Sequence, residues 1–459
     1  MLSLNEAAEQ IRIRKLSPVE LTQECLARIE RLNPTLNAFI TVTSDQALEQ
    51  ARQAECEVMA GNWRGPLHGI PIALKDLLDT AGLLTTAASN QFRKRVPTED
   101  AGVVRILKRA GAVLVGKTNL HEFAFGGSGV VSAFGPVKNP WDLRRITGGS
   151  SSGSAAAVAT GMCVAALGTD TGGSIRCPAA LCSIVGHRPS NGLLSLRGVI
   201  PLSASFDTVG PMTQTVRDAV LVCQALATTD STAATSDGRD VFTPSRIDES
   251  VAKLAVAVPT AGFFDDIAAD VQPVVDDALK VVRSLVASDR EVSLPAPDRG
   301  KVFNAEVYEY HEPMVIQSPE LYQSNTLDRL RSCAGISASD YIRNVRSLAA
   351  VEKQARELCR GVDALLTPAV HVIAPKLAQL QSMEAMALRQ FETRWLLRNT
   401  IPFSALCWPS VSVPCGFTRD GLPVGLQISA PPGRDNVVLR LAHAYEQATD
   451  WHKRRPATG

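Results

Sequence analysis

The sequence predicts an α/β protein in which helices cover a central sheet. Three short apolar runs bounded by glycine, at residues 70–74, 112–115 and 164–167, have the length and composition of buried strands. Helical patterns, such as those at 100–110 and 154–160, lie between the runs. Alternation of buried strands with helices is typical of a layered fold in which one sheet is covered on both faces.

Composition limits the classes of protein. The chain has 459 residues, of which 45% are hydrophobic and 20% charged, as in folded globular proteins. Its 47 Lys and Arg residues nearly balance its 46 Asp and Glu residues. Because it has no basic surplus, we expect no nucleic-acid partner and no membrane partner.

Further absences predict a cytoplasmic protein without a metal. Residues 1–20 lack the apolar segment of a signal peptide, and the most apolar stretch, 155–168, is too short to cross a bilayer. The ten cysteines form no C-x-x-C pair, which favours reduced thiols. The seven histidines have no metal-binding spacing, so we expect no metal site.

The first and second of four predicted regions are an N-terminal helical segment and the α/β core. Residues 1–60 are predicted to be helical, because apolar residues recur there every three or four positions. Residues 61–225 contain the alternating strands and helices of the core. A polar stretch of small residues at 228–244 then predicts a loop.

The last two regions are an insertion and a return to the sheet. Residues 226–400 are predicted to be a variable, mostly helical insertion that shapes the substrate pocket. Residues 401–459 are predicted to add a strand at 410–414 and a closing helix at 437–447, whose Val438, Leu441 and Tyr445 share one face. The prediction is therefore one large α/β unit with a helical insertion.

Three segments are candidates for chemistry. Residues 147–154 place glycines and serines directly before an alanine-rich helix, where backbone N–H groups and hydroxyls can converge. Residues 168–176 place paired glycines and Ser174 after a strand, which suits an oxyanion hole beside a nucleophile. Lys75 ends an apolar run, and burial there would lower its pKa. Taken singly, the segments also fit a helix cap, a turn and a surface lysine.

Together, these segments resemble the amidase signature family. The resemblance rests on residues 69–76, 148–154 and 170–179, and it extends to 111–119 and 421–427. It implies an α/β/α sandwich around a large mixed sheet. It also implies hydrolysis of amides without a cofactor.

The resemblance implies a role for each motif residue. Ser174 would be the nucleophile, Ser150 the bridging serine, following a cis peptide bond, and Lys75 the general base. The backbone N–H groups expected to hold the oxyanion are those of Thr171, Gly172, Gly173 and Ser174. The chain departs from the family's usual pattern at Ser152, which stands in place of a glycine and could narrow the site.

Substrate contacts are expected from a nearby segment and from the serine loop. The residues expected to bind substrate are Gly126, Gly127, Ser128 and Ser151. Phe123 and Phe125, with the small residues that follow them, suit an apolar acyl or aryl group. Malonamide-type hydrolysis in the family uses an arginine where this chain has Cys177, which disfavours a carboxylate-bearing substrate.

Three functions remain open, and a free-standing amidase is the favoured one. Such an enzyme would hydrolyse a small hydrophobic amide, an anilide as in the aryl-acylamidases, or a carbamate, as a monomer or a homodimer. The alternative is the glutaminase subunit of a tRNA-dependent amidotransferase. Those subunits normally have Ser-Ser-Leu-Asp-Gln where this chain has residues 204–208, and an arginine-rich segment that is not recognisable at 330–347, whereas residues 449–452 do resemble them. A binding protein with a dead site would lack one of the three catalytic residues, and none is missing.

Overall fold

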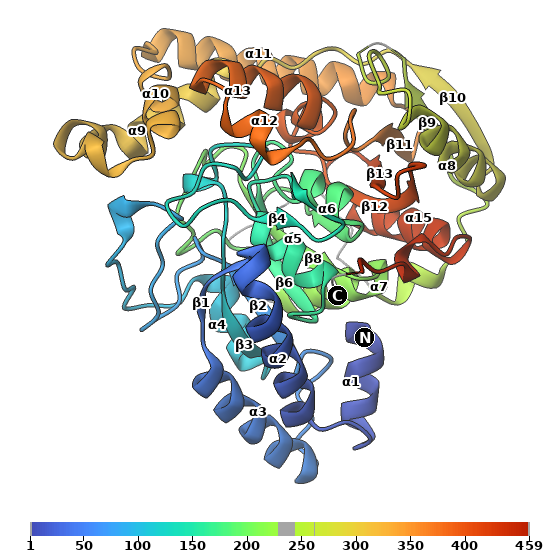
Figure 1. Cartoon of the computed structure of the whole chain (residues 1–459). Helices are drawn as coiled ribbons and strands as arrows, with labels where there is room; N and C mark the ends of the chain where they lie inside the picture. Colours follow the sequence, from blue (N-terminus) through green and yellow to red (C-terminus); the bar gives the residue numbers. More distant parts are fainter. Residues whose placement is uncertain (1, 228–243, 261, 458–459) are drawn as a thin grey trace.

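The computed structural model describes residues 2–227, 244–260 and 262–457 of the chain. One mixed sheet lies at the centre of the fold. Its eleven strands lie in the order β1-β3-β2-β6-β8-β7-β12-β13-β11-β9-β10 (Figure 1). The strands are β1 (Phe39–Val42), β2 (Pro71–Lys75), β3 (Val113–Thr118), β6 (Ala165–Asp170), β7 (Val185–Arg188), β8 (Thr208–Thr213), β9 (Ala255–Pro259), β10 (Ser288–Val292), β11 (Ala364–Pro368), β12 (Ser410–Phe417) and β13 (Pro423–Ser429). A separate hairpin pairs β4 (Lys138–Asn139) with β5 (Asp142–Ile146).

Helices cover both faces of the sheet because successive side chains of each strand point to opposite faces. In β2, Ile72 and Leu74 pack in a cluster with α4, whereas Ala73 packs with α5. This arrangement confirms the predicted α/β class and its layers. The helices are α1 (Leu4–Arg12), α2 (Pro18–Leu36), α3 (Ser44–Met59), α4 (Gly102–Arg109), α5 (Ser152–Ala159), α6 (Arg176–Cys182), α7 (Val216–Leu226), α8 (Gln272–Leu285), α9 (Gly300–Gln317), α10 (Ser324–Arg331), α11 (Ala338–Leu358), α12 (Leu377–Gln381), α13 (Ala385–Phe391), α14 (Ile401–Ala405) and α15 (Asp435–Gln447).

Strands occur in the two regions that the sequence patterns predicted to be helical or mostly helical. The N-terminal segment contributes β1, which pairs antiparallel with β3 at one edge of the sheet. Residues 226–400 hold helices α8 to α13 but also β9, β10 and β11. Strand β10 has no apolar pattern because it is an edge strand whose first four residues, 288–291, are exposed. The predicted loop at 228–244 lies outside the described residues, apart from Pro244.

The sheet positions the candidate site where β2 and β6 end. These strands are parallel neighbours, third and fourth from the β1 edge of the sheet, and Ala73 lies opposite Ala166. Their carboxyl ends therefore meet, and α5 begins beside them. Within the part of the chain that the structure describes, no helix combines the length and apolar character needed to cross a membrane.

Candidate active site

Lys75 is the last residue of β2 and is completely buried. Its Nζ donates hydrogen bonds to Ser150 Oγ at 2.7 Å and to Thr169 Oγ1, on the neighbouring strand β6, at 2.8 Å. Burial lowers the pKa of Lys75 from 10.5 to about 7, although the carboxylates of Asp170 and Asp207 favour the charged form. A lysine with this pKa is available as a base near neutral pH.

Ser150 lies in the loop before α5, and the Gly149–Ser150 peptide bond is cis. The Gly149 N–H donates to the carbonyl of Gly127 at 2.7 Å, and the Ser150 carbonyl accepts from the His121 N–H at 3.1 Å. Only glycine fits at position 149, because an added Cβ would lie 2.8 Å from the backbone nitrogen of Gly129. These contacts fix the Ser150 hydroxyl beside Lys75.

Ser152 closes this loop and does not narrow the pocket. Its Oγ donates to the carbonyl of Gly148 at 2.7 Å, one turn back along the chain. Gly129 packs directly on this hydroxyl, because a Cβ there would lie 2.1 Å from it. The departure from the family's usual pattern is therefore accommodated inside the protein.

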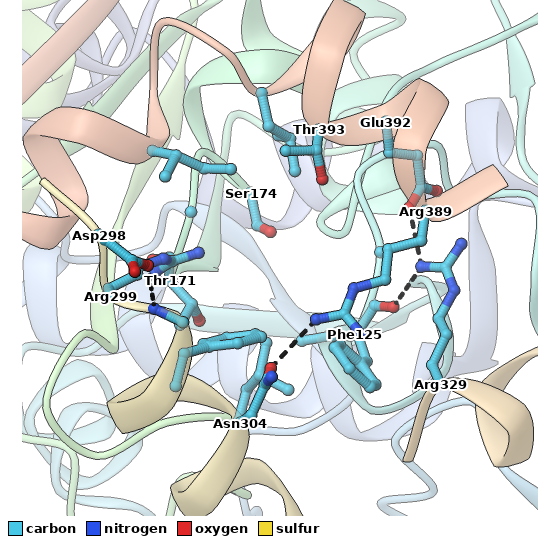
Figure 2. A pocket seen from close by; sticks show the side chains of 18 of the residues that line it. Phe125, Thr171, Ser174, Asp298, Arg299, Asn304, Arg329, Arg389, Glu392 and Thr393 are labelled. Atoms are coloured by element: carbon cyan, nitrogen blue, oxygen red, sulfur yellow. Dashed lines mark hydrogen bonds and ion pairs between the residues drawn. The ribbon is translucent and has the colours of Figure 1, made fainter. Parts of the chain in front are cut away.

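Ser174 lies in the loop after β6, with its hydroxyl directed into a cavity (Figure 2). Its carbonyl accepts from the Ser151 N–H at 3.2 Å, which ties the two serine loops together. Within the described residues, Ser174 Oγ has no protein hydrogen-bond partner. The structure thus brings Lys75 and Ser150 into direct contact and leaves the Ser174 hydroxyl open to a ligand.

The expected oxyanion donors divide into two groups. The Gly173 N–H donates to Asp170 Oδ1 at 2.8 Å, so it is not available to a ligand, contrary to expectation. The N–H groups of Thr171, Gly172 and Ser174 have no acceptor among the described residues. Three of the four expected donors therefore remain free for an oxyanion.

A buried carboxylate braces this loop. Asp170 accepts two hydrogen bonds from Arg176, at 3.0 and 2.9 Å, and a longer one from Arg188 at 3.3 Å. The two guanidinium groups hold the pKa of Asp170 well below its usual range, although burial opposes them. Because Asp170 also binds the Gly173 N–H, it fixes the position of the loop that carries Ser174.

Replacing Asp170 with asparagine should lower the free energy of unfolding by about 3–5 kcal/mol, because two buried arginines would lose their carboxylate. Urea unfolding at pH 7 measures the change. The matched control is Asp277→Asn, because Asp277 pairs with Lys280 on the surface. That substitution should cost less than about 1 kcal/mol. Equal losses in the two variants would contradict the bracing role of Asp170.

The cavity beside Ser174 has a volume of about 260 Å³. Of the four residues expected to bind substrate, only Gly126 lines it. Ser128 instead donates its N–H and its hydroxyl to Glu392, and Ser151 donates its hydroxyl to the carbonyl of Thr169 at 3.3 Å. Gly127 packs against Leu397 and binds the serine loop through its carbonyl. These three residues shape the site from behind the cavity wall.

Charged side chains that the sequence analysis missed line part of the cavity. They are Asp298, Arg299, Arg329, Arg389 and Glu392, from the region 226–400 (Figure 2). Phe125 and Phe303 supply apolar surface between them. The expectation of a hydrophobic site was therefore incomplete. Apolar side chains such as Phe125, Phe303 and Leu397 do line the cavity, but the prediction, which rested on residues 123–128 and on 383, 386, 391 and 395, included none of the charged groups. Arg389 and Glu392 lie where α13 passes into a single π-helical turn, a feature frequent at functional sites.

Comparison with known proteins agrees with this fold and site. A family model described as Amidase matches residues 20–439. Fold, site and match define an enzyme that acts on the carbon–nitrogen bond of amides. The chain belongs to the Amidase family.

Similar proteins cover the whole chain, and several are A subunits of glutamyl-tRNA(Gln) amidotransferases. The one from Hahella chejuensis is 38% identical to this chain, over 100% of this chain and 99% of its own. The solved structure of the one from Thermotoga maritima has a TM-score of 0.81 and 33% identity, covering 98% of this chain and 96% of that one. Another solved structure has a TM-score of 0.89 and 30% identity, and the match covers 98% of this chain and 99% of that one. It is described as a vestigial protein complex that reveals the evolutionary origins of an s-triazine catabolic enzyme.

These relatives correct two expectations. The predicted free-standing amidase for hydrophobic amides, anilides or carbamates is contradicted by full-length similarity to amidotransferase subunits. The expectation of no nucleic-acid partner is contradicted as well, because these relatives are named for a tRNA substrate. The error came from weighing two local departures, at residues 204–208 and 330–347, above similarity that is spread along the chain.

Proposed function

We propose that this chain is the glutamine-hydrolysing subunit of an amidotransferase complex that acts on glutamyl-tRNA. The observation that carries the proposal is the buried Lys75 Nζ, 2.7 Å from Ser150 Oγ, in a loop that is hydrogen-bonded to the loop whose Ser174 lines the cavity. Full-length similarity to the amidotransferase subunits supports glutamine as the nitrogen donor. In this proposal the chain releases ammonia, and partner subunits hold the acceptor.

The proposed reaction begins with proton transfer. Neutral Lys75 accepts the proton of Ser150, while Ser150 accepts the proton of Ser174. Ser174 Oγ then attacks the carbonyl carbon of the glutamine side chain. The N–H groups of Thr171, Gly172 and Ser174 stabilise the resulting oxyanion, each contributing about 3 kcal/mol where it is well aligned.

Collapse of this intermediate releases ammonia. Ser150 gives its proton to the leaving nitrogen and regains one from protonated Lys75, the carbon–nitrogen bond breaks, and the glutamyl group remains as an ester of Ser174. Water attacks the ester and gives a proton to Ser150, which passes its own proton to Lys75. Ser150 then protonates Ser174 Oγ as glutamate leaves, and Lys75 returns a proton to Ser150. Ser174 Oγ has no hydrogen-bond partner in the described structure. In this proposal its side chain therefore rotates toward Ser150 when the substrate binds.

Ammonia release from glutamine tests the proposal. We expect the purified chain, alone or with the remaining subunits of the Hahella chejuensis enzyme, to convert glutamine to glutamate and ammonia. With those subunits, glutamyl-tRNA should gain an amide nitrogen from ¹⁵N-amide glutamine. Failure to release ammonia from glutamine in both preparations would overturn the proposed function.

A further inference from the structure

The peptide units of the loop that carries Ser174 are held through their carbonyl groups. A trans peptide unit is planar, and its C=O and N–H bonds point in opposite directions. The units between Asp170 and Ser174 are trans. A hydrogen bond that holds one carbonyl therefore also sets the direction of the N–H group of the next residue.

Three of the four carbonyls in this stretch have a partner outside the loop. The pairs are the Asp170 carbonyl with Arg188 and Thr208, the Thr171 carbonyl with Arg299, and the Gly173 carbonyl with the Cys177 N–H. These bonds direct the three free oxyanion donors described above, because each donor N–H follows one of the held carbonyls.

The fourth carbonyl, that of Gly172, is held by Thr400. Thr400 immediately precedes α14 and is completely buried, outside the residues that line the cavity. Its Oγ1 lies 2.6 Å from the Gly172 carbonyl oxygen and 3.1 Å from that of Leu397, and its single proton goes to the nearer acceptor. Gly173 packs on this hydroxyl, because a Cβ at that position would lie 2.1 Å from Thr400 Oγ1.

The Gly172–Gly173 unit is the one in this loop that turns most easily. Glycine flanks it on both sides, and Gly173 has a φ of +131°, which residues with a side chain rarely adopt. Thr400 holds its carbonyl, and Asp170 Oδ1 accepts its N–H at 2.8 Å. Because the unit links the donors of Gly172 and Ser174, its rotation would change the angle between these two N–H groups.

Oxyanion stabilisation depends on this angle. A donor contributes fully only when it points at the position that the oxyanion takes in the transition state, and a displacement of about 1 Å can cost about 100-fold in rate. Donors that are fixed beforehand also need no reorganisation when the charge develops. A residue that fixes them can therefore act on the reaction without touching the substrate.

We propose that Thr400 is a positioning residue of the oxyanion hole, which holds the Gly172 carbonyl so that the N–H groups of Gly172 and Ser174 converge on the oxyanion. The inference rests on the proposed acyl transfer to Ser174, and it holds for whichever amide is the substrate. It predicts a loss of kcat with little change in KM, because the bound substrate carries no oxyanion before the reaction begins.

Two measurements test the inference on the full chain, with the partner subunits added if hydrolysis needs them. The first is kcat and KM for ammonia release from glutamine. The second is the rate at which an alkyl fluorophosphonate labels Ser174, followed by mass spectrometry, which needs no amide substrate. In this labelling Ser174 Oγ bonds to phosphorus, fluoride leaves, and the Ser174 proton passes to Ser150 as Ser150 passes its own to Lys75. Negative charge develops on the phosphoryl oxygen, as it does on the carbonyl oxygen of an amide.

The variants separate the hydroxyl of Thr400 from the shape of its side chain. Thr400→Val and Thr400→Ala remove the hydroxyl, the first with nearly unchanged shape, and Thr400→Ser keeps it. The matched control is Thr43→Val, because Thr43 is also buried and its Oγ1 donates to a backbone carbonyl, that of Leu114, at 2.8 Å. Thr43 lies before α3, outside the residues that line the cavity. Urea unfolding at pH 7 checks that each variant is folded.

We expect Thr400→Val and Thr400→Ala to lower kcat and the labelling rate about 10- to 100-fold, with KM within about threefold of the wild type. Thr400→Ser should retain most of both rates, and Thr43→Val should retain both fully. The pH dependence of kcat/KM in Thr400→Val should keep the midpoint of the wild type, because the substitution leaves Lys75 and its contacts in place.

Other outcomes separate the inference from the proposed function. Unchanged labelling and unchanged glutamine hydrolysis in Thr400→Val overturn the positioning role and leave the glutaminase proposal intact. Slower labelling in Thr400→Val but not in Thr400→Ser, in a protein that does not hydrolyse glutamine, supports the positioning role and overturns the glutaminase proposal. The inference is overturned by equal losses in Thr43→Val, by an equal loss in Thr400→Ser, by unfolding of both hydroxyl-free variants, or by a wild type that is not labelled at Ser174.

Discussion

The Ser174→Ala variant is expected to lose about 10⁴- to 10⁶-fold in the rate of amide hydrolysis, because the proposed acyl-enzyme could not form. Its free energy of unfolding should change by less than about 0.5 kcal/mol. The Ser174 hydroxyl has no protein partner among the described residues, so its removal breaks no hydrogen bond. Ammonia release from glutamine and urea unfolding measure the two quantities.

Ser183 provides the matched control for Ser174. Its hydroxyl is also without a partner in the described structure, but it lies between α6 and β7, outside the residues that line the cavity. Ser183→Ala should therefore retain wild-type activity. Activity that persists in Ser174→Ala above about one percent of the wild type would contradict a Ser174 nucleophile.

The second large effect is expected at Lys75. Replacing it with methionine keeps the length of the side chain but removes the base, and should lower kcat about 10³- to 10⁴-fold. In the wild type, kcat/KM should rise with pH through the Lys75 pKa of about 7 and then level off, because the neutral amine is the active form. A profile that is flat from pH 5.5 to 8.5 would contradict this role.

Lys75 also makes stability depend on pH, with a defined sign. Its pKa is about 7 in the folded protein against 10.5 ordinarily, so the unfolded chain binds more protons between those values. The free energy of unfolding should therefore rise with pH across this window, by at most about 1.4 kcal/mol per pH unit. Lys75→Met should lack this rise and should be more stable than the wild type at pH 6. Urea unfolding at pH 6, 7.5 and 9 tests the sign.

The sequence predicts the central part of the fold because local patterns and architecture agree there. The apolar runs at 70–74, 112–115 and 164–167 all became neighbouring strands, β2, β3 and β6. Their order in the sheet brings Lys75 and the two serine loops together. Strand β10 could not be predicted, because an exposed edge strand needs no apolar pattern.

The cavity was beyond prediction for a different reason. Arg299, Arg329 and Arg389 are up to 90 residues apart in sequence, and a single arginine in a helical pattern is normally a surface residue. Only the packing of the folded protein shows that Arg329 is buried and paired with Glu392, whereas other arginines nearby are exposed. Gly173 was misassigned for a different reason, because the sequence does not show that the Asp170 side chain, three residues earlier, accepts its N–H.

The order of strands in the sheet has a consequence for synthesis on the ribosome. Strand β7, at residues 185–188, pairs with β12, which begins at residue 410. More than two hundred residues must therefore be translated after β7 before its partner emerges. In the meantime β7 presents an unpaired edge, the kind of surface that promotes aggregation and recruits chaperones. Closing so long a loop also slows folding. We therefore expect expression yield to improve at low temperature or with added chaperone.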